Sequence, residues 1–320
     1  MKDIYIGHFA HVLGDIELSV EATIKQGRTL IKDPQTFRKA GFEKHHICSP
    51  GVSAYDLATA TVKQIDTQLQ DVGAIIYTTA LPVNANLGKG FEQTKDIKDL
   101  TDFPASHLQS DFGLNGAWVV GLDQQACTGM LGSLKLAAAL LRETPNWKKI
   151  LCVTADRFPE GSLYEQSYSL ISDGASACIV SSEPIIGGFR YIEHYGVTNG
   201  GMSKTTDDQT VGSFFPNTVD CINTNVKRAG LKLKDIQWLV TQNINVNAWK
   251  ITCSPELLDY DFQQICYPSL HSSGHVISGD CIINTQMLLS SGKIQPEDYV
   301  LLYMVGYGLN WQSVILQYFE

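Results

Sequence analysis

The sequence has no surplus of positive charge. Its 24 Lys and Arg residues are outnumbered by 33 Asp and Glu residues, which gives a net charge of −9, and only 18% of the residues are charged. Proteins that bind nucleic acid gather Lys and Arg side chains against the phosphate backbone. This composition therefore argues against nucleic acid as a partner.

The chain also lacks long apolar runs and paired-cysteine motifs. No window reaches the roughly 20 consecutive apolar residues that cross a bilayer, and the start MKDIYIGHFA does not have the regions of a signal peptide. The eight cysteines are scattered without a Cys-x-x-Cys pair, which gives a zinc or dithiol motif no support. We therefore expect a cytoplasmic protein without a membrane span, without a metal site, and with mostly reduced, structural cysteines.

Three segments of the first part of the chain have counterparts, in the same order, in the second part. Each pair shares its pattern of helix-like and strand-like residues. The pairs are residues 62–79 with 226–243, 148–156 with 299–308, and 173–182 with 309–318. We infer two similar halves, 1–184 and 185–320, that form one compact unit.

Both halves alternate strands with helices, which predicts an α/β architecture. Segments such as AIIYTT and VLLYMV are apolar on both faces, as strands of a sheet covered by helices are. The helix predicted at 131–143 has apolar residues at Leu131, Leu134, Ala138 and Leu141, a spacing that forms one buried face.

Cys127 differs from the other cysteines in its surroundings. Residues 118–141 read as a strand, a sharp turn, Cys127 and a helix. The start of a helix favours negative charge and hence a reactive thiolate. The small neighbours Ala126, Gly129 and Gly132 let a substrate approach. This is the setting of a nucleophile, and the alternative is a buried cysteine that begins an ordinary helix.

Several segments together resemble one enzyme family over nearly the whole chain. They are KAGFEKHHI, FPASHLQSDFGL, DQQACTGMLGSLKLA, DGASACIVSS and GKIQPEDYVLLYMVGYGLNW, the last of which includes Gly-x-Gly-x-x-Trp at 306–311. Their order and spacing resemble the β-ketoacyl-ACP synthase III branch of the thiolase-like condensing enzymes. The resemblance implies a thiolase-like fold, with duplicated α/β halves in a five-layered αβαβα core. It also implies a homodimer, or a heterodimer with a homologous subunit.

The resemblance assigns a role to Cys127 and to a second loop. Cys127 aligns with the cysteine that accepts an acyl group from acyl-CoA or an acyl carrier protein, so coenzyme A or phosphopantetheine enters as substrate and no further cofactor is implied. The loop Gly306-Tyr307-Gly308 aligns with a backbone donor of the oxyanion hole, beside the N–H of Cys127. Such donors stabilise the tetrahedral intermediate of acyl transfer.

Four other residues receive substrate or partner roles from the same resemblance. Phe103 aligns with a residue that reaches the acyl pocket of the partner subunit. Arg38 and Lys39 align near the coenzyme A entrance, and Lys250 aligns near the docking surface of the carrier. The three basic residues are equally consistent with plain solvated surface.

The chain departs from the family at two motifs that drive decarboxylation. Where the family has a histidine, the segment TQNIN has Gln242, which donates hydrogen bonds but cannot take a proton. Asn243 and Asn245 follow, and Asn245 is a candidate for substrate binding. The segment LHSSGHVISGD replaces the second motif, in which the family has an asparagine.

The second segment supplies the candidate acid–base residues. His275, close to Asp280, is the best proton carrier, with His271 as second choice and Ser272 as a substrate-binding candidate. The pattern resembles a side branch that transfers acyl groups to oxygen or nitrogen without decarboxylation, although that branch normally keeps the first histidine. The alternatives are a histidine that only satisfies backbone groups, and a weaker metal site formed by His271, His275 and Asp280.

Three functions follow from these residues. The first is an acyltransferase of the ketoacyl synthase III type, which loads Cys127 and passes the acyl group to an acceptor in fatty-acid-like, polyketide or other secondary metabolite biosynthesis. His275 or Gln242 assists the attack of the acceptor, so Cys127, His275, Gln242 and Asp280 are the candidate catalytic residues. The second is a decarboxylative β-ketoacyl synthase that uses a malonyl thioester. The third is a degenerate subunit that packs against an active homologue.

Overall fold

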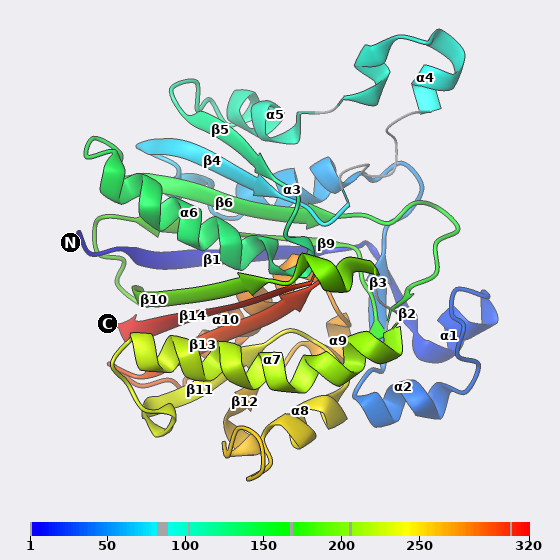
Figure 1. Ribbon diagram of the computed structural model, residues 1–320. Helices are drawn as coiled ribbons and strands as arrows, with labels where there is room; N and C mark the ends of the chain where they lie inside the picture. Colours follow the sequence, from blue (N-terminus) through cyan, green and yellow to red (C-terminus); the bar gives the residue numbers. More distant parts are fainter. Residues whose placement is uncertain (1, 82–88, 102, 167–168, 205–206, 308) are drawn as a thin grey trace.

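A ten-stranded mixed sheet runs through the centre of the protein (Figure 1). The computed structural model describes residues 2–81, 89–101, 103–166, 169–204, 207–307 and 309–320. From one edge to the other, the strands are β12 (Ile265–Cys266), β11 (Ile236–Thr241), β13 (Tyr299–Gly306), β14 (Asn310–Phe319), β10 (Gly188–Thr198), β1 (Tyr5–Leu13), β9 (Gly174–Ser181), β6 (Lys149–Asp156), β4 (Val72–Thr78) and β5 (Trp118–Leu122).

The two halves of the sheet have the same strand pairing. In the first half, β4 is parallel to both β5 and β6, β6 is antiparallel to β9, and β9 is antiparallel to β1. In the second half, β11 is parallel to both β12 and β13, β13 is antiparallel to β14, and β14 is antiparallel to β10. The antiparallel pair of β1 and β10 joins the halves at the centre. All three predicted segment pairs occupy matching positions in this topology.

Helices cover both halves and also fill the space between them. The central helices α6 (Gly129–Glu143) and α10 (Asp280–Ser290) each contact strands of both halves. On the outer sides, α3 (Ala54–Lys63) packs on β9, β1 and β6, and α7 (Asp207–Arg228) packs on β14 and β10. One hydrophobic cluster surrounds α6 and α10, and a separate cluster lies under each outer helix. The result is the expected duplicated, five-layered αβαβα arrangement.

The pattern of side chains explains where the helices begin and which face they bury. Leu131, Leu134, Ala138 and Leu141 of α6 are all buried, as their spacing predicts. The start of α3 has a capping box, in which the Ser53 side chain accepts from the backbone of Asp56 and the Asp56 carboxylate accepts from the backbone of Ser53. The remaining α-helices are α1 (Val20–Lys25), α2 (Pro34–Ala40), α4 (Lys89–Thr94), α5 (Pro104–Asp111), α8 (Val246–Thr252) and α9 (Leu270–Ser273).

Two small two-stranded sheets lie outside the large sheet. Strands β2 (Ile16–Ser19) and β3 (Lys44–Ile47) pair with each other and, with α1 and α2, form a unit whose core includes Leu170 and Leu270. Strands β7 (Glu165–Gln166) and β8 (Ser169–Leu170) form the second small sheet. This brings parts of the first half against α9, which directly precedes His275.

The boundary inferred at 184/185 lies between β9 and β10, and the division into two domains there stays a prediction. All eight cysteines are free and buried. In the part of the chain that the structure describes, none of the helices is both long and apolar enough to cross a membrane.

Candidate active site

Cys127 lies in a short 3₁₀ turn, Ala126–Thr128, which leads directly into α6. Ala126 adopts a left-handed backbone conformation with φ of 45°, which turns the chain sharply at this point. Gly129 is required at the first position of α6, since a Cβ there would lie 2.1 Å from Thr78 Oγ1. The thiol is 6% exposed and borders a cavity, so the turn presents it to a bound ligand.

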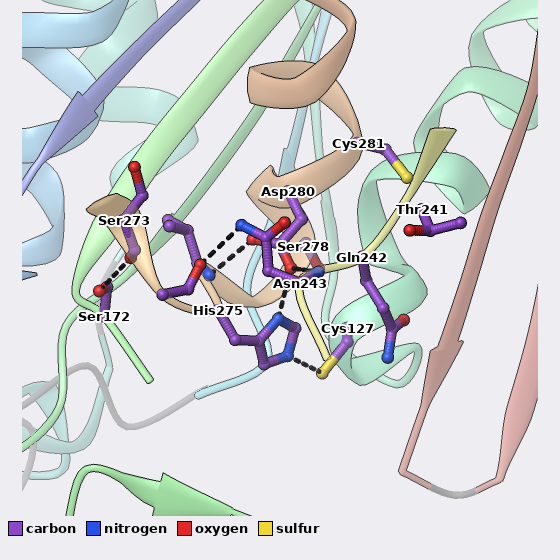
Figure 2. Close-up of polar contacts among 12 residues, drawn as sticks. Cys127, Ser172, Thr241, Gln242, Asn243, Ser273, His275, Ser278, Asp280 and Cys281 are labelled. Carbon is purple, nitrogen blue, oxygen red and sulfur yellow. Dashed lines mark hydrogen bonds and ion pairs between the residues drawn. The ribbon is translucent and has the colours of Figure 1, made fainter. Parts of the chain in front are cut away.

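His275 and Asp280 form a hydrogen-bonded line that ends at the thiol (Figure 2). His275 Nε2 lies 3.4 Å from Cys127 Sγ, and His275 Nδ1 lies 2.5 Å from Asp280 Oδ2. A carboxylate can only accept, so Nδ1–H donates to Asp280, which leaves the Nε2 lone pair toward the thiol in the neutral ring. This is the arrangement of a nucleophile, a base and a carboxylate that orients the base.

The surroundings of His275 raise its pKa well above the ordinary value. Burial alone would lower the pKa, but the negative charge of Asp280 and the Cys127 sulfur outweigh burial, and both hydrogen bonds act in the same direction. His45 provides a contrast. Its ring contacts the neutral groups Ile171 O and Thr23 Oγ1, and burial lowers its pKa to about 4. The neighbouring carboxylate therefore distinguishes the candidate catalytic histidine.

The loop that carries His275 is held by backbone bonds from the first half. His275 N–H donates to Leu170 O at 2.7 Å, and Ser172 N–H donates to His275 O at 2.9 Å. Gly274 has φ of 61°, and a Cβ there would lie 2.7 Å from Leu170 O, so only glycine fits this close approach. The imidazole is thus fixed relative to Cys127 by contacts from both halves.

A buried network of side-chain amides supports Asp280 and the histidine loop. The backbone N–H of Asn243 donates to Asp280 Oδ2 at 2.7 Å, and Val276 N–H donates to Oδ1 at 2.7 Å. Asn243 Nδ2 donates to Gly274 O and to Ser269 Oγ, and Asn284 bonds both Asn243 and Ser269. Sequence reasoning did not assign Ser269 or Asn284, and the one available signal was the position of Asn243 beside Gln242.

The loop after β13 packs directly on the cysteine turn. A Cβ at Gly306 would lie 2.9 Å from Cys127 N and 2.8 Å from Gln125 O, so the glycine permits this close packing. Tyr307 lines the same cavity as Cys127. This places the loop where the predicted oxyanion donor is expected, while Gly308 lies outside the described residues. Backbone donation by Tyr307 stays a prediction.

A cavity of about 340 Å³ opens onto Cys127 and His275. Its walls are made of aromatic, aliphatic and uncharged polar residues from both halves. The described lining residues are Cys127, Gln166, Ser169, Thr210, Phe214, Phe215, Gln242, Ile244, Asn245, Asn247, Ala248, Ile251, His275, Val305, Gly306, Tyr307, Leu309 and Trp311. A space of this volume accommodates a small organic ligand.

The structure brings some of the predicted residues together at this cavity. Cys127, Gln242, Asn245, His275 and Tyr307 line it, and Asp280 lies directly behind His275. Other candidates are not part of the described lining. They are Phe103, Arg38, Lys39, Lys250, His271 and Ser272. Their substrate or partner roles stay predictions.

Several of these outlying residues have identifiable surroundings. Arg38 forms an ion pair with Glu21 at 2.5 Å, and the Ser272 hydroxyl lies near Ser269 O and Ser273 Oγ. Phe103 precedes α5 and is 62% exposed. Among the described residues, no cluster of three His, Cys, Asp or Glu side chains could hold a metal ion.

Two family models match the parts of the chain that build this site. The model for 3-oxoacyl-[acyl-carrier-protein] synthase III matches residues 123–194, and the model for its C-terminal region matches residues 226–318. Together they cover just over half of the sequence. The chain belongs to the 3-oxoacyl-ACP synthase III family of thiolase-fold condensing enzymes. The first match contains Cys127, and the second contains Gln242, His275 and Asp280.

Individual relatives of this synthase III family member are distant but cover most of its length. A β-ketoacyl-ACP synthase III from Wolbachia pipientis wMel is 24% identical over 302 residues, which cover 88% of this chain and 89% of the relative. Among solved structures, ChlB3, described as an acyltransferase, has a TM-score of 0.82 at 19% identity and covers 99% of this chain and 98% of its own. The synthase III of Aquifex aeolicus VF5 has a TM-score of 0.81 at 16% identity, with 98% and 100% covered.

Proposed function

We propose that this protein is a two-step acyltransferase that carries its acyl group on Cys127. The observation that carries the proposal is the line of Cys127, His275 and Asp280 at the wall of the cavity. In the first step, His275 takes the thiol proton, and the sulfur attacks the carbonyl carbon of an acyl thioester. The donor thiol leaves with that proton, and the acyl group stays on Cys127.

The second step uses the same histidine as a base toward an acceptor. The pKa of His275 is raised by both Asp280 and the Cys127 sulfur. Acylation removes the ionisable thiol and with it that part of the effect, so the imidazole of the acyl-enzyme binds a proton less tightly. His275 is then poised to accept the proton of an incoming nucleophile, and Asp280 stabilises the imidazolium that forms.

Gln242 supports transfer without decarboxylation. Loss of carbon dioxide from a malonyl thioester leaves an enolate, which a family member stabilises with a histidine and an asparagine. Here the amide of Gln242 occupies the first position, and His275 already bonds Cys127 and Asp280. His275 is the one histidine among the described residues that line the cavity.

The donor is proposed to be acyl-CoA or an acyl carrier protein in the cytoplasm. Asn247 of the cavity wall donates from Nδ2 to Lys39 O at 3.3 Å, so the end of α2 adjoins the cavity. Lys250 lies on α8, next to Ile251 of the cavity wall. Both lysines are exposed and could contact phosphates of a pantetheine carrier.

A homodimer is proposed to form through the edge of the sheet at β5. This strand is at one end of the strand order, and its Trp118 side chain is 49% exposed. Phe103 and Leu100 are exposed nearby in the sequence, before α5. An edge strand with large apolar neighbours favours pairing with a second copy.

Intact-mass measurement tests the proposal directly. We expect that short- and medium-chain acyl-CoA add one acyl group to the wild type and none to Cys127→Ala. Cys253→Ala is the matched control, because this thiol is also free and similarly buried, at 8% exposed, but lies outside the described lining of the cavity. An acyl adduct that persists in Cys127→Ala, or a wild type that stays unmodified with every donor, including acyl carrier thioesters, would refute the proposal.

The names of the curated relatives favour a second candidate. They are β-ketoacyl-ACP synthases III, and this favours decarboxylative condensation with a malonyl thioester. Release of carbon dioxide from malonyl-ACP by the preloaded enzyme, together with a β-ketoacyl product, would support condensation over transfer.

A further inference from the structure

We propose that the acceptor is a neutral alcohol and that Gln242 selects it over an amine. This inference rests on the proposed acyl transfer and names the class of its second substrate. It is based on the orientation of one side-chain amide, on the number of lone pairs of the attacking atom, and on the absence of Asp, Glu, Lys and Arg from the described cavity wall.

Gln242 is held in one orientation by the backbone. Its Oε1 accepts a hydrogen bond from Val305 N–H at 2.7 Å, and the side chain is buried except where it borders the cavity. This hydrogen bond turns the oxygen toward the backbone of β13, and no hydrogen bond from Nε2 to another described residue is formed. Figure 2 shows His275 and Gln242 on either side of the Cys127 sulfur, with the amide nitrogen of Gln242 on the sulfur side. The cavity thus presents a base and a pure donor around the thiol.

A hydroxyl group can form hydrogen bonds to both Gln242 and His275 while its oxygen attacks the acyl carbon. Its oxygen has two lone pairs and one proton. One lone pair accepts from Gln242 Nε2–H, the proton points to His275 Nε2, and the second lone pair attacks the acyl carbon. A neutral amine has a single lone pair, which the attack consumes, so it cannot accept from Gln242 at the same time. The buried amide would then lose its partner, at a cost that disfavours amide formation.

The charge of the cavity wall points in the same direction. No Asp, Glu, Lys or Arg occurs among the described residues that line the cavity. An aliphatic amine arrives as an ammonium ion at neutral pH and would find no Asp or Glu side chain in the described lining to replace its water, and a carboxylate-bearing acceptor would find no Lys or Arg there. A neutral hydroxyl compound has the smallest desolvation cost on entering this cavity.

The transfer balances with the groups at the site. The oxygen–carbon bond forms as the hydroxyl proton moves to His275 Nε2, which gives a tetrahedral intermediate on Cys127. Collapse of the intermediate breaks the carbon–sulfur bond, and His275 returns the proton to the departing sulfur. The products are an ester and the free thiol of Cys127, and no oxidant or further co-reactant is needed.

Acyl-enzyme prepared with acyl-CoA, then freed of the donor, tests this inference in single turnovers. Benzyl alcohol and aniline are offered as probes of similar size that are both neutral at pH 7, and ester, amide and residual acyl-enzyme are measured. We expect the ratio of ester to amide formation to be about tenfold higher in the wild type than in variants without the Gln242 donor, a change that corresponds to one hydrogen bond. Gln242→Glu and Gln242→Met, which both lack the donor, should lose about tenfold in ester formation with little change in amide formation.

Gln237→Glu is the matched control. Its Oε1 also accepts from a backbone N–H of β13, that of Tyr299 at 2.7 Å, but it lies at the other end of β11 and outside the described lining of the cavity. Gln237→Glu should keep the wild-type ratio of ester to amide formation. The inference is overturned if the wild type forms amide and no ester, if neither probe captures the acyl group, or if both Gln242 variants lose the two reactions equally. A wild type that never forms an acyl-enzyme would refute the proposed function itself, which is a separate result.

Discussion

The two central helices begin in the same way and carry different chemistry. Each follows a 3₁₀ turn, Ala126–Thr128 before α6 and Ile277–Gly279 before α10, and the first residue of each turn has φ of 45°. By position, Cys127 corresponds to Ser278, and Gly129 corresponds to Asp280. The two turns contact each other, and Ser278 Oγ donates to Ala126 O at 2.8 Å.

The two turns contribute different residues to the candidate site. The turn before α6 presents a thiol to the cavity, and its helix begins with Gly129, because Thr78 leaves no space for a side chain. The turn before α10 has Ser278, whose hydroxyl donates to the backbone of the other turn. The helix that follows begins with Asp280, whose carboxylate accepts from His275. The two halves thus contain two copies of one turn, one that carries the proposed nucleophile and one that supports the proposed base.

Removal of the Asp280 charge should have the largest effect on this division. In Asp280→Asn, the His275 ring loses the carboxylate that raises its pKa and fixes its tautomer, so acyl release should fall about 10²- to 10³-fold. The base works when it is unprotonated, so the rate rises with pH through the pKa of His275. Because that pKa falls without the carboxylate, the rise should move to lower pH. Single-turnover release from preloaded acyl-enzyme, measured across pH, checks both effects.

Asp235→Asn is the control for this pH profile. Its carboxylate accepts a backbone bond from Lys232 on the surface, away from the cavity. That variant should keep both the rate and the pH midpoint of the wild type. An unchanged pH midpoint of acyl release in Asp280→Asn would mean that the carboxylate supports the loop of His275 without changing the pKa of the imidazole.

Two parts of this site could be predicted from the sequence because each is local, although the contact between Cys127 and His275 joins residues far apart in the chain. The turn before a helix predicts the role of Cys127, and His275 and Asp280 are close enough in the chain to suggest a pair. The amide network of Asn243, Ser269 and Asn284 could not be predicted, because it joins segments far apart in the sequence. The same holds for the ion pair of Arg38 with Glu21, because side-chain direction on an exposed helix depends on tertiary packing.

The fold could be predicted further than the site. The repeated patterns indicated which strands correspond, and the strand order agrees. They did not indicate that β8 and the residues after it would bond the loop of His275, since two-residue strands have no detectable period. The left-handed residues Ala126 and Ile277 were equally hidden, because neither residue type favours that conformation.

Filling the space at Gly129 should disturb the turn that carries the thiol. In Gly129→Ala, the new Cβ would lie 2.1 Å from Thr78 Oγ1 at the end of β4 and 3.2 Å from Ser278 Oγ, so the start of α6 must move away from both β4 and the turn before α10. We expect a loss of about 1–3 kcal/mol in the free energy of unfolding, measured by urea denaturation. Adding Thr78→Ala removes the nearest atom and should restore part of the loss.

Gly132→Ala, one turn further along α6, is the matched control for this clash. Its nearest neighbours would be side-chain atoms of Gln125 and Leu122 at 3.2 Å, which can move. Alanine also favours the helix, so the change should stay within about 1 kcal/mol. Equal losses in both variants would show that the start of α6 tolerates displacement.

Replacing the left-handed residues by glycine should separate backbone strain from side-chain burial, and Ala126→Gly should have the smallest effect of the three main substitutions. Ala126→Gly relieves a positive φ and removes one methyl group, so it should stabilise the fold by up to about 1 kcal/mol. Ile277→Gly relieves the same strain but deletes a side chain buried in the central cluster, and should cost about 2–4 kcal/mol net. Urea denaturation of both variants gives the difference. If Ala126→Gly destabilises instead, the methyl group of Ala126 contributes packing beside Cys127 that outweighs its strain, and the two turns are then less alike than their backbones indicate.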